Sequence, residues 1–197
     1  FAVAAHDRGA RVAHRLTLDH PGAVRRVALL DIVPTRTLFE ATDMDLALGY
    51  EHWFSLAQPT PFPETLIDAA PIAYLHAKLG GWGSALSIYP PAVLAEYERC
   101  IQDPATVHAM CEDYRAAATL DLEHDRADAA ARIACPLLVL WGERGLMHRH
   151  FDVPATWRAK HARPDQVRAH LVPGGHFLAE EAPDVVGPAL EAFLAAG

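Results

Sequence analysis

Short, mainly hydrophobic runs occur at four places along the chain. They occupy residues 1–5, 26–32, 136–142 and 169–172. Such runs, without regular polar alternation, are typical of parallel strands that are covered by helices on both faces of a sheet. A helix is predicted over residues 8–20, between the first two runs, and Pro21-Gly22 ends it. This strand–helix–strand order predicts a right-handed parallel crossover.

The hydrophobic period changes after the second run. Residues 35–132 carry only helical signals, and we expect helices there over 43–58 and 103–120. A further helix is predicted over 183–196, with a kink or restart at Gly187-Pro188. A long helical insertion between strands predicts a cap above an active site. We therefore divide the chain into three parts, which are an α/β core over 1–34, a helical cap over 35–132 and the second part of the core over 133–197.

Asp7 lies where the first strand is expected to turn into a helix. It is flanked at two residues' distance by the small residues Ala5 and Gly9, which is the pattern of the nucleophile elbow of α/β-hydrolases with aspartate in place of serine. A carboxylate can attack a saturated carbon that bears a leaving group, and water can then cleave the resulting ester. Because residue 1 already lies inside the strand, we expect a C-terminal part of an α/β-hydrolase whose N-terminal strands are absent.

Two further candidate catalytic groups follow predicted strands. Asp31 ends the second strand and His176 follows the last, and the carboxyl ends of parallel strands meet at one edge of the sheet. The order Asp7, Asp31, His176 is the α/β-hydrolase order of nucleophile, acid and histidine. The other common place for the acid, three residues after Gly142, holds Gly145 instead. We expect Asp31 to orient a neutral His176 that takes a proton from water.

Arg8 and Arg11 stand at the start of the helix that follows Asp7. The helix N-terminus favours an anion, and guanidinium groups bind carboxylates by charged hydrogen bonds. The pair therefore indicates a small carboxylate substrate. The alternative is that both arginines form salt bridges with surface acids.

At this point the sequence resembles the fluoroacetate (haloacetate) dehalogenases. The resemblance is carried by the stretches 5–15, 29–34, 52–54, 109–118 and 173–177. It implies hydrolytic dehalogenation of short haloacids through an ester on Asp7, with no metal and no organic cofactor. It also implies a halide pocket, an aromatic residue along the substrate channel and a homodimer. The residues concerned are His52, Trp53 and Tyr114 for the halide and Trp82 for the channel. From spacing alone, ordinary packing of the cap is the preferred interpretation of Trp53 and Tyr114, and only the resemblance assigns them to the halide.

Composition and charge narrow the possible partners to small molecules. The formal net charge of −8 argues against binding to nucleic acid, and no apolar run approaches the roughly 20 residues of a membrane span. Three cysteines without metal-ligand spacing favour a reducing, cytoplasmic location. The expected partner is a small haloacid.

Two other functions fit parts of this pattern. An epoxide hydrolase would use the same Asp-His-Asp logic and needs two cap tyrosines, of which Tyr114 is one candidate, but it has no use for the arginine pair. A non-catalytic hydrolase fragment that binds a partner is the second. The intact Asp7, Asp31 and His176 argue against a degenerate site.

Overall fold

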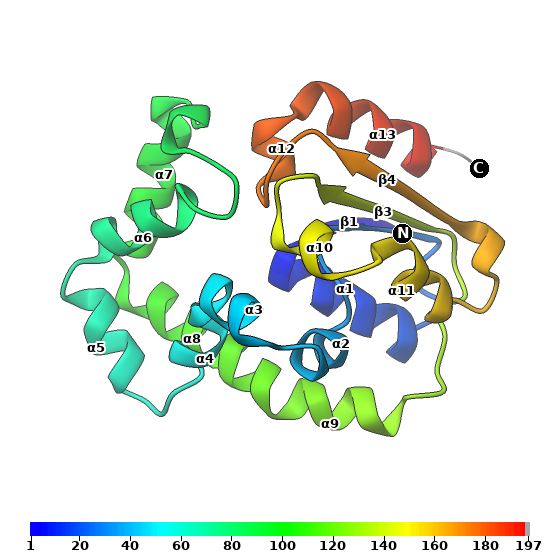
Figure 1. Cartoon of the computed structure of the whole chain (residues 1–197), viewed down its shortest axis with the longest axis horizontal. Coiled ribbons are helices and arrows are strands. Elements are labelled where there is room, and N and C mark those ends of the chain that lie inside the picture. Colours follow the sequence, from blue (N-terminus) through cyan, green and yellow to red (C-terminus); the bar gives the residue numbers. More distant parts are fainter. Residues whose placement is uncertain (196–197) are drawn as a thin grey trace.

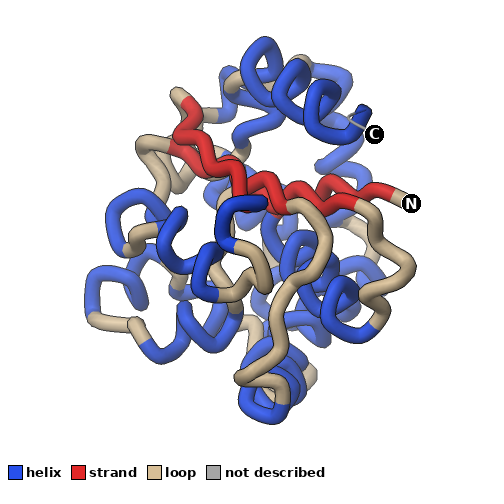
Figure 2. Tube along the Cα trace, turned by 90° about the vertical axis from the view of Figure 1, so that its right-hand side faces the viewer, coloured by secondary structure: helices blue, strands red, loops and turns tan. Residues whose placement is uncertain are grey.

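The computed structural model describes residues 1–195 and has a four-stranded parallel sheet at its centre. The strands follow one another across the sheet in chain order. Figure 2 shows them as one band with helices on both sides. Their bounds are β1 (Ala2–His6), β2 (Arg26–Leu30), β3 (Leu137–Gly142) and β4 (Val167–Val172). All four predicted strands are confirmed within two residues at each end.

The two faces of the sheet bury different residues of the same strands. In β2, Val27 and Leu29 face one hydrophobic cluster, whereas Ala28 and Leu30 face another. β3 divides its side chains in the same alternating way, because successive residues of a strand point to opposite faces. This double burial explains why the runs contain so little polar alternation.

A helix covers each face of the sheet. Helix α1 (Asp7–Asp19) lies below the sheet in Figure 1, and α13 (Pro183–Ala195) lies above it. The helix expected over 183–196 is thus present as far as 195, and residue 196 lies outside the described part, as does 197. Helix α13 continues through Gly187 and Pro188 as one element, so the expected restart does not occur.

The chain between β2 and β3 forms helices that lie to the left of and below the sheet in Figure 1. They extend from α2 (Thr35–Glu40) to α9 (Leu120–Ala127). Between these two lie α3 (Met44–Gly49), α4 (Glu51–Ser55), α5 (Phe62–Asp68), α6 (Pro71–Leu79), η1 (Leu86–Ile88), α7 (Pro91–Ile101) and α8 (Pro104–Ala118). The helix expected over 103–120 is α8. The segments that follow β3 are α10 (Leu146–His150), α11 (Val153–Ala159), η2 (Pro164–Gln166) and α12 (Leu178–Glu181).

The single helix expected over 43–58 is wrong, because the chain breaks it at Tyr50. Tyr50 has φ −112° and ψ 37°, outside the helical region, and separates α3 from α4. Gly49 packs so closely on Leu146 that a Cβ there would lie 2.6 Å from a Leu146 methyl group. This tertiary contact bends the chain and buries His52 and Trp53. None of the helices in residues 1–195 is both long and apolar enough to cross a bilayer.

Candidate active site

Asp7 occupies the sharp turn between β1 and α1. Its φ is +48°, a left-handed conformation that non-glycine residues seldom adopt and that is often found at functional sites. The side chain is 31% exposed. A strained, partly exposed carboxylate at the carboxyl end of a buried strand has the placement that a nucleophile requires.

The structure brings the three predicted catalytic residues together. His176 Nδ1 lies 2.7 Å from Asp31 Oδ2, and His176 Nε2 lies 3.8 Å from Asp7 Oδ2. Asp31 is buried, has φ +53°, and its Oδ1 accepts a hydrogen bond of 3.1 Å from the Gly142 amide. The Asp31 carboxylate is therefore held between the end of β3 and the histidine.

Gly145, at the other common place for the acid, lies directly beside Asp31. A Cβ built on Gly145 would lie 3.4 Å from Asp31 Oδ2 and 3.5 Å from Oδ1. The two alternative acid positions thus converge on one region of space. The absent side chain at Gly145 leaves room for the carboxylate of Asp31.

Mutual charge stabilises the ionised forms of Asp7 and His176. Burial raises the pKa of Asp7, but the interactions with His176 and the nearby charge of Arg11 more than compensate and lower it below its ordinary value. Burial lowers the pKa of His176, but Asp31 and Asp7 more than compensate and raise it to about 10. The expected neutral ring is therefore wrong for the resting site, in which His176 is protonated. Asp7 is consequently a carboxylate at neutral pH, as a nucleophile must be.

Two residues hold the histidine loop by hydrogen bonds, namely Trp82, which was predicted to line the channel, and His6, which the sequence analysis did not single out. The His176 amide donates a hydrogen bond of 3.1 Å to the Trp82 carbonyl oxygen. His6 Nε2 lies 2.8 Å from the His176 carbonyl oxygen and therefore donates to it. The imidazole rings of His6 and His176 lie 4.6 Å apart. The position of His6 next to Asp7 was the available signal for this role.

A pocket of about 160 Å³ opens beside Asp7 and His176. Of the predicted halide-binding and channel residues, His52, Tyr114 and Trp82 line it, and much of the remaining lining is aliphatic. Burial lowers the pKa of His52 to about 3, so its ring is neutral. His52 Nδ1 is buried, and no described residue gives it a hydrogen-bond partner.

Trp53 lies behind this pocket rather than in its lining. It is 1% exposed, and its ring contacts those of Tyr114 and Phe39. Its indole also lies against the guanidinium groups of Arg8 at 5.4 Å and Arg11 at 4.4 Å. Trp53 thereby connects the pocket to the arginine pair.

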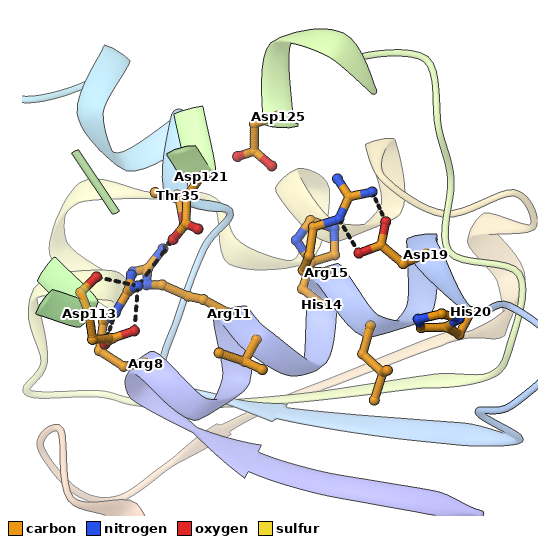
Figure 3. Close-up of a pocket in the computed structure, with 12 residues that line it drawn as sticks. Arg8, Arg11, His14, Arg15, Asp19, His20, Thr35, Asp113, Asp121 and Asp125 are labelled. Atoms are coloured by element: carbon orange, nitrogen blue, oxygen red, sulfur yellow. Dashed lines mark hydrogen bonds and ion pairs between the residues drawn. The ribbon is translucent and has the colours of Figure 1, made fainter. Parts of the chain in front are cut away.

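Arg8 and Arg11 line a second pocket of about 250 Å³ beside α1, which Figure 3 shows. Arg8 Nε lies 2.6 Å from Asp113 Oδ2, and Arg8 Nη2 lies 3.1 Å from Asp121 Oδ2. The buried Arg11 donates through Nη1 to the Val33 carbonyl oxygen at 2.6 Å. The acids that hold Arg8 are over a hundred residues away in the chain, and the sequence analysis did not find them.

Each arginine nevertheless keeps one buried N–H group without a partner in the described structure. These groups are Arg8 Nη1 and Arg11 Nε. Buried donors in folded proteins are normally satisfied, so each unsatisfied one requires an explanation. Neither arginine lines the pocket of Asp7 and His176, so binding of a substrate carboxylate by this pair stays a prediction.

One group of side chains in the described part of the chain has spacing compatible with a cation. It consists of Glu64 on α5 and of His108 and Glu112 on α8. Arg115 forms ion pairs with both of these glutamates. The guanidinium group of Arg115 thus already balances the negative charge of Glu64 and Glu112 that would otherwise attract a metal cation.

Comparison with known proteins agrees with this geometry. No protein-family model matches the chain. It is 41% identical to a fluoroacetate dehalogenase from Burkholderia sp over 195 residues, which are 98% of this chain and 63% of that protein. A candidate α/β hydrolase from Nostoc sp PCC 7120 is 53% identical with a TM-score of 0.95, and the match covers 100% of this chain and 67% of that one. A variant of a candidate epoxide hydrolase from Pseudomonas aeruginosa with bound MFA is 43% identical with a TM-score of 0.90, covering 99% and 65%.

A parallel sheet with an elbow aspartate, a histidine and a second aspartate at one edge defines a hydrolase-type site. The chain belongs to the α/β hydrolases. It spans 63% of the length of the dehalogenase and 67% of the Nostoc protein.

Proposed function

We propose that the protein to which this chain belongs hydrolyses short haloacids, releasing halide and a 2-hydroxy acid such as glycolate. The observation that carries this proposal is the elbow carboxylate of Asp7, 3.8 Å from a histidine that is itself 2.7 Å from the buried Asp31. The 41% identity to a fluoroacetate dehalogenase supports the same reaction class.

In the first step, an Asp7 carboxylate oxygen attacks the carbon that bears the halogen. A carbon–oxygen bond forms, the carbon–halogen bond breaks, and the halide leaves with the bonding electrons. Asp7 needs no base for this step because its lowered pKa leaves it ionised. The product is an ester between Asp7 and the substrate.

In the second step, water attacks the carbonyl carbon of that ester. His176 accepts a proton from the water through Nε2, while Asp31 orients the ring through Nδ1. The carbon–oxygen bond of the acyl group breaks, which releases the hydroxy acid and restores the carboxylate of Asp7. This proton restores the charged ring of the resting site and replaces the proton that His176 releases to solvent when the ester forms.

Two sets of groups would hold the substrate. Arg8 and Arg11, which line the neighbouring pocket beside α1, would bind its carboxylate by charged hydrogen bonds. Tyr114 is suited to donate to the departing halide, because burial raises its pKa and keeps its hydroxyl protonated. His52 lines the same pocket, and donation from either ring nitrogen depends on its tautomer. Trp53 would act by fixing the arginines against its ring.

An epoxide hydrolase is the second candidate, because two tyrosines line the pocket of Asp7. Tyr74 joins Tyr114 there, and burial raises the pKa of both. Two phenols are what protonation of an opening epoxide oxygen requires. Halide release from chloroacetate, compared with diol formation from styrene oxide, distinguishes the two activities. A homodimer and a cytoplasmic location stay predictions.

A single turnover in water enriched in heavy oxygen tests the ester mechanism. With enzyme in excess over substrate, the water oxygen enters the Asp7 carboxylate and glycolate carries the old enzyme oxygen. We expect the label in the peptide that contains Asp7. Label found in glycolate, with that peptide unlabelled, would mean that water attacks the substrate directly and would refute the proposal.

A further inference from the structure

Lys78 is the one described residue lining the pocket of Asp7 that carries a fixed positive charge. It is also one of only two lysines in the chain, the other being Lys160. The mechanism above does not use it. Its neighbours in the lining include aliphatic side chains such as Leu75 and Leu79, so its charge is the exceptional feature of that wall.

The ammonium group of Lys78 is held by two aromatic rings and one carboxylate. Its Nζ lies 5.3 Å from the ring centre of Tyr74 and 5.7 Å from that of Trp82, which is the range of cation–π attraction. It also pairs with Glu51. The Lys78 side chain is 21% exposed, whereas that of Glu51 is 52% exposed. Lys78 thus lines the pocket, whereas about half of the side chain of its counterion is exposed to water.

An anionic substrate benefits from such a cation because the site holds two carboxylates, Asp7 and Asp31, and the protonated ring of His176 balances only one of them. Like charges that approach within a few ångströms repel strongly in a partly desolvated site. Arg8 and Arg11 line the other pocket, and Asp113 and Asp121 already neutralise the charge of Arg8. The field of Lys78 reaches into the pocket, where it contributes to lowering the pKa of His52.

We propose that Lys78 is a specificity-determining residue that draws carboxylate-bearing substrates into the pocket of Asp7. This role rests on the proposed function. An ammonium group has three N–H donors, so a carboxylate can bind one of them while Glu51 keeps another. An ion pair with a half-exposed partner is weak, and it yields readily to the incoming anion. Lys78 thus acts on capture of the substrate, whereas the arginines hold it during reaction.

The test compares Lys78→Met with the matched control Lys160→Met in the full chain. Halide release is measured with chloroacetate and with chloroacetamide, its uncharged analogue. For Lys78→Met we expect kcat/KM for chloroacetate to fall about tenfold, the lower end of the effect of charge-steered association. The kcat for chloroacetate and the kcat/KM for chloroacetamide should not change.

Two further measurements sharpen the result. Added salt should lower kcat/KM for chloroacetate in the wild type and in Lys160→Met, and much less in Lys78→Met. The variant Lys78→Arg, which retains the charge, should keep most of the selectivity for the anion. Glu51→Gln removes the competing carboxylate and should raise kcat/KM for chloroacetate.

Equal losses with both substrates would show that Lys78 only supports packing, and no loss with either would show that it is idle. Both results overturn the proposal. If the wild type releases no halide at all, the proposed reaction fails, and calorimetric binding of acetate then decides the role of Lys78. Weaker acetate binding in Lys78→Met supports anion capture, and equal binding refutes it.

Discussion

A carboxylate at position 145, after the end of β3, should be able to orient His176 in place of the carboxylate of Asp31, which follows β2. Replacing Asp31 by Asn removes the negative charge behind the imidazole ring. The amide can then accept a hydrogen bond from His176 Nδ1 only when its oxygen, and not its NH₂ group, points toward the ring. In serine proteases the same change behind the catalytic histidine lowers kcat about 10⁴-fold. Here two backbone hydrogen bonds, to His6 and Trp82, still hold the histidine loop. We expect a loss of about 10³-fold, equivalent to about 4 kcal/mol.

The geometry at Gly145 sets the magnitude of the rescue. Its Cβ would lie 3.4 Å from the present position of Asp31 Oδ2, and a carboxylate oxygen lies about 2.4 Å from its own Cβ. An aspartate introduced at Gly145 can therefore bring an oxygen within about 1 Å of that position, close to His176 Nδ1. An asparagine at position 31 would still fill that space, so the rescue starts from Asp31→Ala, and we expect Asp31→Ala, Gly145→Asp to recover at least about tenfold of the rate lost in Asp31→Ala.

The assay is halide release under single-turnover and steady-state conditions. The Asp31→Asn variant should still release a burst of halide and then accumulate the ester on Asp7, because the second step depends on His176 and the first does not. Mass spectrometry of the intact chain reports that ester. Gly145→Asp alone serves as the control for crowding. If the double variant Asp31→Ala, Gly145→Asp is no faster than Asp31→Ala while its fold is intact, the inference that the two acid positions converge is refuted.

Other substitutions test the nucleophile, the packing and the buried charges. Asp7→Asn should abolish halide release measured with an ion-selective electrode, and His176→Asn should release about one equivalent per chain and retain the acyl mass. Gly142→Ala should lower the free energy of unfolding in urea by more than about 2 kcal/mol, because its Cβ would lie 2.0 Å from a backbone oxygen. Gly9→Ala should not lower it, because a Cβ at Gly9 would meet no atom within 4 Å. Burial lowers the pKa of His14 to about 3. At this residue the unfolded chain therefore binds a proton below about pH 6.5 that the folded chain does not. His14 alone thus lowers the free energy of unfolding by about 2 kcal/mol between pH 7.5 and pH 5, and the change measured in the wild type should differ from that in His14→Gln by this amount.

The strands and the residues at their carboxyl ends could be predicted because local signals determine them. An unbroken hydrophobic run can be buried on both faces only inside a helix-covered sheet, and Asp7, Asp31 and His176 follow such runs. Parallel strands then bring these three residues to one edge whatever the intervening cap does. The distances between them agree with that expectation.

The prediction was wrong where a distant contact overrides local propensity. Residues 43–58 have a continuous helical pattern, yet packing of Gly49 on Leu146 and the non-helical backbone of Tyr50 divide the helix. The partners of Arg8 are a similar case, since Asp113 and Asp121 carry no local sign that they face α1. Contacts between segments a hundred residues apart depend on how the cap lies against the core, and periodicity contains no information about that arrangement.

The charges of the site also imply an order of events in the proposed reaction. His176 owes its raised pKa to hydrogen bonds and charges from both Asp31 and Asp7. Formation of the ester removes the charge of Asp7, so the pKa of His176 must fall and the ring can release its proton. The histidine then becomes a base only when an ester is present to be hydrolysed. An NMR titration should give a lower pKa for His176 in Asp7→Asn than in the wild type, and an unchanged pKa would refute this coupling.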